Sequence, residues 1–412
     1  MTWKIDLNQA TLALTDALDL VGVDSFQHGK RVGFMAAAGW DRLPLQPISQ
    51  NELLQLGMLH DVGVSSSRMH VNLVVNFQWE GEATHCQVGH DLLKQFPPFA
   101  KLAPYVLYHH SPLDRLVGLP DEVALIANWI YLVDRADTLA ALRGKNDILE
   151  MSDEILDRLA SKSGDCFFPE LVRLFGQLTG SQSFWLQQLP QHLNRYFHAL
   201  ELEANPVEVS FEEVRSLAKV FSQVVDAKSP FTQEHSLGVA SLSVLIGKSF
   251  GLPQDQLEKL EIAGLLHDLG KLKVPDEVLD KAGPLNAHER ALMTHHSFDT
   301  FQILSRIIGM EEIAQWAAFH HESPQGQGYP FHLHGRDLSL EAKIIAVCDV
   351  FHALVQARPY RDSLPAPKVA EILRKMEAEG KLDGGLVEWV HANLDRCYET
   401  AKTFSGATNG PK

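Results

Sequence analysis

Histidine and aspartate recur in the same order in the two halves of this chain. Each half carries a single His, an adjacent His–Asp pair, another single His, an adjacent His pair and a final Asp. In the first half these are His28, His60, Asp61, His85, His109, His110 and Asp134. In the second half they are His235, His267, Asp268, His296, His320, His321 and Asp349. Coincidence does not keep so many metal-capable side chains in register, so the pattern indicates an internal duplication.

The spacing between matching residues grows in two steps. It is 207 residues for the first His and the His–Asp pair, 211 for the next His and the His pair, and 215 for the final Asp. Each step indicates a loop insertion in the second half. One insertion falls in the segment that follows the His pair there, HHESPQGQGYP. The halves are therefore expected to share a scaffold and to differ in a loop beside the candidate site.

Helical periodicity dominates the rest of the chain. Apolar residues recur at three- and four-residue spacing in 211–227, 233–250 and 288–308, which is typical of amphipathic helices. The segment 71–77, VNLVVNF, is the one run that suggests a strand. A polar join that contains proline, 201–210, is the best domain boundary. We therefore predict an all-α fold of two tandem helical bundles, residues 1–203 and 204–412, with a frayed tail from Ser405.

Composition excludes several functional classes. Among 412 residues, 36 Lys and Arg stand against 52 Asp and Glu, and the net charge of −16 argues against a protein that binds long nucleic acids. No apolar run is long enough to cross a membrane. The start of the chain carries acidic residues where a signal peptide needs a basic end. Four cysteines without a CxxC pair are typical of a reduced, cytoplasmic protein. The sequence sets no oligomeric state.

The repeated His and Asp residues predict metal sites. Imidazole suits zinc, iron, manganese, nickel or copper, and carboxylates add harder oxygen donors. Seven candidate ligands in each half exceed the four that a structural zinc uses. They suit two ions bridged by a carboxylate, with Asp268 as the bridge in the second half, and such pairs catalyse in-line phosphoryl displacement. Phosphoester hydrolysis is the expected reaction class.

The other histidines are interpreted as ordinary polar residues. His295 is set aside in favour of His296, because His296 precedes Leu304 by the eight residues that separate His85 from Leu93. The remaining histidines treated in this way are His70, His90, His192, His198, His288, His332, His334, His352 and His391.

Three stretches of the second half carry a family resemblance. They are HDLGK from His267, HHESPQGQGYP from His320, and CDVFHAL from Cys348, which is followed by Arg358, Pro359 and Tyr360. Together they resemble the HD-GYP family, bacterial metal-dependent phosphodiesterases that hydrolyse cyclic di-GMP and, in some members, cyclic GMP-AMP. The match covers about residues 211–405 and is specific because the motifs occur together. The first half resembles the wider HD phosphohydrolase superfamily without the GYP loop.

The resemblance implies roles for individual residues. The metal ligands would be the seven of the second half, with Asp268 and Lys271 as the catalytic pair and iron or manganese as the expected ions, others being possible. Lys271 and Arg358 would contact substrate phosphate, as a point charge and a planar fork respectively. The loop beside the site would be shaped by Gly326, Gly328, Tyr329 and Pro330. The first half would hold a further metal site.

Some positions depart from the family pattern. Phe231 stands four residues before His235, where some members carry a Glu that binds a third metal, so two metals are expected in the second half. The adjacent Glu234 is a poor substitute, and His352 replaces a later Asp. In the first half Val64 replaces the Lys. The positions there that bear on metal or phosphate binding are Asp24, Arg68 and Arg143.

The sequence therefore predicts a cyclic dinucleotide phosphodiesterase in the second domain. Two alternatives stay open, a metal-containing receptor that does not hydrolyse its ligand and a generic HD nucleotidase. For the first domain we expect either removal of a terminal phosphate from the linear product or a purely structural role. The partner is a small molecule, with neither a long nucleic acid nor a membrane.

Overall fold

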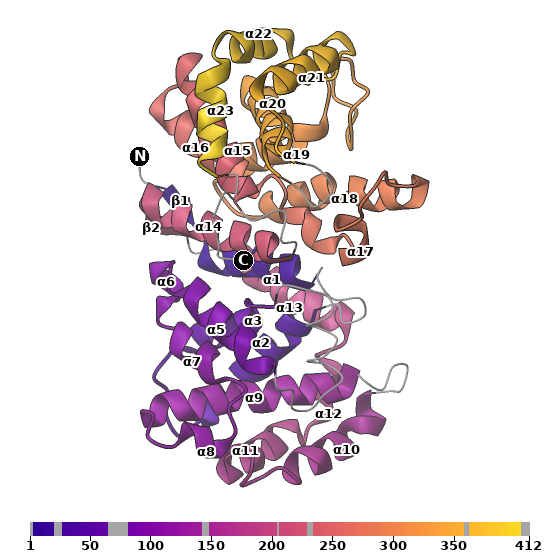
Figure 1. The fold of residues 1–412 in the computed structure, drawn as a ribbon. Helices are drawn as coiled ribbons and strands as arrows, with labels where there is room; N and C mark the ends of the chain where they lie inside the picture. Colours follow the sequence, from indigo (N-terminus) through magenta and orange to yellow (C-terminus); the bar gives the residue numbers. More distant parts are fainter. Residues whose placement is uncertain are drawn as a thin grey trace. The chain divides into compact units, whose positions relative to one another are not determined.

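The computed structural model describes residues 3–19, 27–64, 81–141, 148–203, 206–228, 234–357 and 362–404. Regular structure in these ranges is almost entirely helical, which confirms the predicted all-α class (Figure 1). Among the described residues one small sheet joins β1 (Trp3–Ile5) to β2 (Val207–Val209). The tempting strand at 71–77 lies outside the described residues.

The chain forms two compact units. The N-terminal unit is Asp6–Val207, and the C-terminal unit is Glu208–Lys412 together with the N-terminal strand β1. The structure divides the chain at 207/208, where the sequence predicted a boundary at 203/204, and it groups β1 with the C-terminal unit instead of with the first domain. The reason is burial: Trp3 and Ile5 are 6% and 1% exposed, and the Trp3 ring packs 6.4 Å from that of Phe211.

The N-terminal unit contains a series of helices joined by short connections. They are α1 (Leu7–Asp19), α2 (His28–Ala38), η1 (Trp40–Arg42), α3 (Gln50–Leu59), α5 (Glu82–Leu93), α6 (Pro97–Ala100), α7 (Ala103–Tyr108), α8 (Leu113–Leu116), α9 (Asp121–Ala141), α10 (Ile148–Ala160), α11 (Pro169–Thr179), α12 (Gln182–Leu186) and α13 (Pro190–Leu202).

The C-terminal unit repeats the order of the helices that carry the candidate ligands. Its elements are α14 (Phe211–Lys228), α15 (His235–Ser249), α16 (Gln254–Leu266), η2 (Leu269–Lys273), α17 (Asp276–Leu279), α18 (Ala287–Leu304), α19 (Glu311–Ala318), η3 (Phe319–His321), α20 (Leu340–Val355), α21 (Ala366–Ala378), α22 (Gly384–Ala392) and α23 (Leu394–Lys402).

In each unit, one helix packs against the helices on either side of the candidate site. In the N-terminal unit α2 packs against both α3 and α9, and in the C-terminal unit α15 packs against both α16 and α20. Helices α9 and α20 are buried along most of their length, as their predominantly apolar sequences require. A polar residue on the inner face of such a helix is therefore withdrawn from solvent. The last Asp of each predicted ligand set lies on such a helix: Asp134 is buried, and the side chain of Asp349 is 14% exposed.

Capping residues in the sequence mark the start of α3 and of α18. Ser49 and Glu52 form a reciprocal capping box at the start of α3, and Asn286 and Glu289 form one at the start of α18. Each box satisfies backbone N–H groups that the first helical turn leaves without partners. Among the described residues, no helix combines the length and hydropathy that a membrane span requires.

Candidate metal centres

The structure places matching ligands on matching elements of the two units. The first His opens a helix, at the start of α2 and of α15, and follows a residue with positive φ, Gln27 at 74° and Glu234 at 72°. The His–Asp pair directly follows α3 and α16. The third His lies in α5 and α18, the His pair lies at the end of α7 and in η3, and the final Asp lies in α9 and α20. The two four-residue insertions in the second half therefore do not change which helix or turn carries each candidate ligand.

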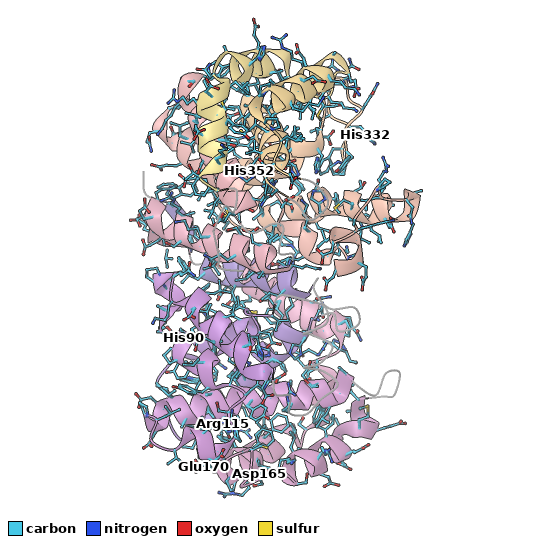
Figure 2. The ribbon with its side chains drawn as sticks, in the orientation of Figure 1. His90, Arg115, Asp165, Glu170, His332 and His352 are labelled. Atoms are coloured by element: carbon cyan, nitrogen blue, oxygen red, sulfur yellow. The ribbon has the colours of Figure 1, made fainter. Side chains whose placement is uncertain are left out.

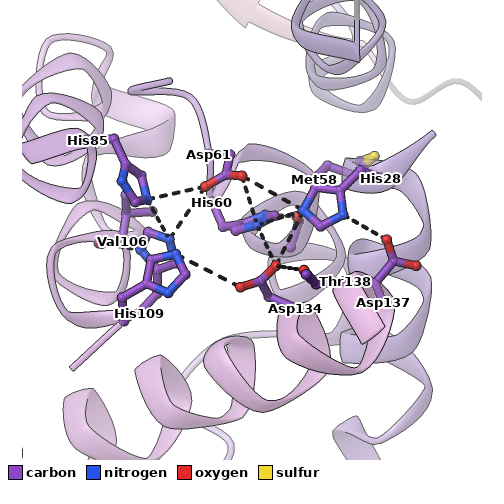
Figure 3. A network of polar contacts seen from close by, with 12 residues as sticks. His28, Met58, His60, Asp61, His85, Val106, His109, Asp134, Asp137 and Thr138 are labelled. Atoms are coloured by element: carbon purple, nitrogen blue, oxygen red, sulfur yellow. Dashed lines mark hydrogen bonds and ion pairs between the residues drawn. The ribbon is translucent and has the colours of Figure 1, made fainter. Parts of the chain in front are cut away.

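In the N-terminal unit, Asp61 lies between two groups of histidines (Figure 3). Its Oδ1 is 3.3 Å from His85 Nε2 and 3.6 Å from His109 Nε2. Its Oδ2 is 3.8 Å from His28 Nε2 and 3.5 Å from His60 Nε2. One carboxylate thus presents one oxygen to each group, which is the arrangement required of a ligand that bridges two ions.

Asp268 holds the same position in the C-terminal unit. Its Oδ1 is 3.7 Å from His296 Nε2 and 3.9 Å from His320 Nε2. Its Oδ2 is 3.9 Å from His235 Nε2 and 3.3 Å from His267 Nε2. This is the geometry that a bridging role of Asp268 requires, and the role itself stays a prediction.

The final Asp of each set completes one side of the cluster. Asp134 Oδ1 lies 3.4 Å from His28 Nε2 and 3.8 Å from His60 Nε2. Asp349 Oδ1 lies 3.1 Å from His235 Nε2 and 3.9 Å from His267 Nε2. The second His of each pair stands close by: the His110 ring is 5.0 Å from that of His85, and the His321 ring is 5.0 Å from that of His296.

Backbone carbonyls orient the ligand rings. His60 Nδ1 lies 2.7 Å from Gly57 O, and His267 Nδ1 lies 2.8 Å from Gly264 O. The same contact to the carbonyl three residues earlier is made by His109, His296 and His320. Because a carbonyl only accepts, Nδ1 carries the proton in each of these rings, and the lone pair of Nε2 points into the cluster.

The protonation state of the C-terminal cluster suits a metal. Burial and the charge of His321 lower the pKa of His296 to about 3, and burial lowers the pKa of His321 to about 4 despite Asp349. Burial alone would raise the pKa of Asp268, but His267 and Lys271 hold it well below its usual range. The neutral imidazoles of His296 and His321 and the ionised carboxylate of Asp268 are the protonation states that a divalent cation binds. Against the effect of burial, Asp268 raises the pKa of His267, so a cation bound there would displace a proton.

The donor set of each unit fits divalent metal ions. Asp61 Oδ1 and Asp268 Oδ1 are buried and accept no hydrogen bond from any residue that the structure describes. A buried carboxylate oxygen without a donor is costly unless a cation faces it. Imidazole nitrogens and carboxylate oxygens match iron, manganese or zinc. The groups of donors that lie mutually within 4.8 Å are Asp61, His85, His109 and His110; His28, His60 and Asp134; His296, His320 and His321; and His235, His267 and Asp268.

Glycines that the sequence analysis did not single out bring the pieces together. A Cβ on Gly63 would overlap the carbonyl oxygen of His85, and a Cβ on Gly270 would overlap that of His296. The segment after each His–Asp pair can therefore lie directly against the helix that carries the third His. The two glycines share the 207-residue spacing of the His–Asp pairs, so the same subtraction would have found them.

The GYP loop of the C-terminal unit lies against its ligands. Tyr329 packs its ring 4.7 Å from that of His321 and 6.4 Å from that of His296, and its N–H donates to His321 O. The peptide bond between Tyr329 and Pro330 is cis. A Cβ on Gly328 would overlap the backbone at 321–322, whereas Gly326 forms the outer turn at φ 73°.

A buried glutamate that sequence reasoning passed over anchors this loop. Glu322 is 4% exposed, and its carboxylate accepts hydrogen bonds from the N–H groups of Phe331 at 2.6 Å and Leu333 at 2.9 Å. The sequence signal that could have indicated this role is its position directly after the His pair. The predicted phosphate ligand Lys271 lies at the site with Nζ 2.5 Å from Asp268 Oδ2.

Two further groups near the clusters were also missed. Arg135 is 2% exposed and donates to Asp134 Oδ2 through Nε at 3.0 Å and a terminal nitrogen at 2.8 Å. His352, interpreted as an ordinary polar residue, is fully buried and contacts His235, a candidate ligand. It is labelled in Figure 2. The named positions that lie outside the described residues are Asp24, Arg68, His70, Arg143, Phe231, Arg358, Pro359, Tyr360 and the tail from Ser405.

Comparisons with known proteins identify the family to which the chain belongs. The HD domain family matches residues 219–386. The chain is 35% identical over 406 residues to the 3′3′-cGAMP-specific phosphodiesterase 1 of Vibrio cholerae, covering 96% of this chain and 94% of the relative. It is 33% identical over 185 residues to a cyclic di-GMP phosphodiesterase of Pseudomonas aeruginosa, covering 43% of this chain and 42% of that protein.

A solved structure shares the fold. A cyclic GMP-AMP specific phosphodiesterase of Vibrio cholerae superimposes with a TM-score of 0.64 at 24% identity, over 95% of this chain and 98% of that one. At this identity the likeness establishes the fold alone, and it does so across both units. With the HDLGK and GYP motifs of the C-terminal unit and a relative matched along almost its whole length, the chain belongs to the HD-GYP family of the HD superfamily.

Proposed function

We propose that the C-terminal unit hydrolyses a phosphodiester bond of a cyclic dinucleotide and releases a linear dinucleotide. The observation that supports this most is the position of Asp268, whose two oxygens face two histidine groups beside Lys271 and the GYP loop. The names of the relatives, phosphodiesterases for 3′3′-cGAMP or cyclic di-GMP, support the same reaction class.

The metal ligands of this reaction would be the cluster around Asp268. When bound, two divalent ions activate water and stabilise the oxygens of an in-line phosphoryl displacement. Iron or manganese suits the mixed nitrogen and oxygen donors. The residues that would hold the ions are His235, His267, Asp268, His296, His320, His321 and Asp349.

The remaining residues of the site would bind and orient the substrate. Lys271, whose side chain is 21% exposed, would bring its positive charge to a phosphate oxygen, and Arg358 would add a planar fork of donors. Tyr329 covers the rings of His296 and His321 on one side. Glu322 holds the loop that carries this tyrosine, so the wall of the site is positioned before substrate binds.

Among cyclic dinucleotides, we propose 3′3′-cGAMP as the preferred substrate. The relative named for this molecule matches the chain along 94% of its own length, whereas the cyclic di-GMP phosphodiesterase is matched along 42%. Protein purified without oxygen should be supplied with iron or manganese and given each dinucleotide separately, with products separated by chromatography. Faster opening of 3′3′-cGAMP is expected. Equal rates would contradict the preference, and binding without turnover would favour a receptor.

For the N-terminal unit we propose a phosphomonoesterase activity on the linear product or a related nucleotide. The supporting observation is that its cluster has the same bridging carboxylate, Asp61, although it lacks the GYP loop and carries Val64 in place of Lys271. Opening a cyclic dinucleotide leaves a terminal phosphate monoester, which a two-metal site can hydrolyse. The alternative is a structural domain that only stabilises the C-terminal unit.

A further inference from the structure

The first ligand has a different partner in each unit. In the N-terminal unit, His28 Nδ1 lies 2.7 Å from Asp137 Oδ2 (Figure 3). Asp137 is itself held by Arg31, through Nε at 2.5 Å and a terminal nitrogen at 2.9 Å. The Asp137 side chain is fully buried, so this carboxylate has a fixed position behind the His28 ring.

In the C-terminal unit a histidine takes the place of this carboxylate. His352 has the 215-residue spacing from Asp137 that separates the final Asp ligands, and its Nδ1 lies 3.0 Å from His235 Nδ1. Gly238 stands where the N-terminal unit has Arg31, and a Cβ there would overlap the His352 ring. The Arg–Asp pair of one unit is thus replaced by a Gly–His pair in the other.

The two partners constrain the ligand differently. An ionised carboxylate only accepts hydrogen bonds, so Asp137 keeps a proton on Nδ1 of His28 and directs Nε2, the atom that a cation would bind, at Asp61 and Asp134. A neutral imidazole can donate or accept through Nδ1. His352 therefore permits a second arrangement, in which it donates to His235 Nδ1. His235 then presents Nε2–H to Asp349 Oδ1, 3.1 Å away, and has no lone pair for a cation.

We infer that Asp137 and His352 are positioning residues that give the two units different metal retention, tight beside His28 and exchangeable beside His235. The inference rests on the metal binding proposed above. In the N-terminal unit Asp137 holds the His28 ring with Nε2 turned toward the cation site. In the C-terminal unit, in the arrangement that His352 permits, a cation must first displace the Nε2–H to Asp349 contact. The ring-opening activity would then follow the supply of free metal while the N-terminal site stays loaded.

The test measures metal content of the full-length chain, independently of activity. Asp268→Ala leaves the N-terminal site intact, and Asp61→Ala leaves the C-terminal site intact. Each is loaded with Co²⁺, dialysed against increasing chelator concentrations and analysed for cobalt per chain. Because changes to groups behind a metal ligand alter affinity about 10–100-fold, the Asp61→Ala chain should lose cobalt at roughly ten times less chelator.

Reciprocal substitutions separate this inference from other differences between the units. Asp137→Asn in the Asp268→Ala chain should weaken cobalt retention, because an amide can also donate. His352→Asp in the Asp61→Ala chain should strengthen it, and Gly238→Arg with His352→Asp rebuilds the N-terminal arrangement if the single change prevents folding, as followed by circular dichroism. Equal retention in the two parent chains, or a folded Asp-bearing variant that retains no more cobalt, overturns the inference. Failure of both parent chains to bind cobalt would instead refute the metal sites themselves.

Discussion

The two units hold the same seven candidate ligands but surround them with different charges. In the N-terminal unit Arg135 is buried and pairs with the final aspartate Asp134. In the C-terminal unit Lys271 is partly open to solvent and pairs with Asp268, the predicted bridge. The C-terminal unit alone has the GYP loop. The comparison shows that the candidate ligands and the residues expected to contact substrate belong to different parts of the fold. The ligands can therefore be kept while the substrate contacts change.

The largest expected effect comes from removing one bridging carboxylate. Asp268→Ala should reduce opening of cyclic dinucleotides by about 10³-fold or more, at or beyond the upper end of what loss of one electrostatic contact costs an enzyme. Asp61→Ala is the matched control and should open the ring at the wild-type rate. Initial rates measured by chromatography check both. If Asp61→Ala is the variant that stops ring opening, the assignment of the two units is reversed.

The second prediction uses Asp61→Ala to ask whether the N-terminal unit is an enzyme. Wild-type protein should convert the linear product further and release phosphate, whereas the variant should accumulate the 5′-phosphorylated linear dinucleotide. A loss of about 10²-fold or more in phosphate release is expected if a single electrostatic contact is removed. Identical product profiles at identical rates would show that this unit is scaffolding.

The glycines after the His–Asp pairs test whether the two scaffolds are equally tight. Gly63→Ala and Gly270→Ala should each lower the free energy of unfolding by about 1–3 kcal/mol, because the added methyl overlaps a backbone carbonyl. Gly176→Ala in α11 is the control, since nothing lies within 4 Å of its Cβ position. Denaturant unfolding of each variant gives the comparison. If Gly176→Ala lowers the free energy of unfolding as much as the other two substitutions do, the close contacts of Gly63 and Gly270 are not the cause.

The smallest effect should come from loosening the GYP loop. Glu322→Gln keeps the shape of the side chain but offers one oxygen where two N–H groups need acceptors, and hydrogen bonds to charged groups contribute about 1.5–3 kcal/mol. KM for the cyclic substrate should rise several-fold with kcat less affected. In the N-terminal unit Ser111 occupies the corresponding position, and Ser111→Ala should change neither constant. A fall in kcat alone would show that Glu322 does more than hold the loop.

Most of the fold and the grouping of the ligands could be predicted from the sequence, because both rest on spacing. His235, His267 and Asp349 lie at the same places relative to their helices as His28, His60 and Asp134 do. The rest depends on three-dimensional proximity. Asp137 and His28 lie 109 residues apart, and no periodicity links them. The strand β1 was missed because three residues are too few to show an alternating pattern.

The carbonyls behind the ligand rings have a consequence for the metal-free chain. Gly57 and Gly264 lie in the last turns of α3 and α16, where helix geometry leaves carbonyl oxygens without a partner. Each oxygen accepts from a histidine three residues further along, so the ring is oriented by the turn to which it belongs. These imidazoles lose their rotational freedom when the helix forms rather than when a cation arrives. The rings thus lose conformational entropy during folding, and an ion would bind to side chains that are already oriented.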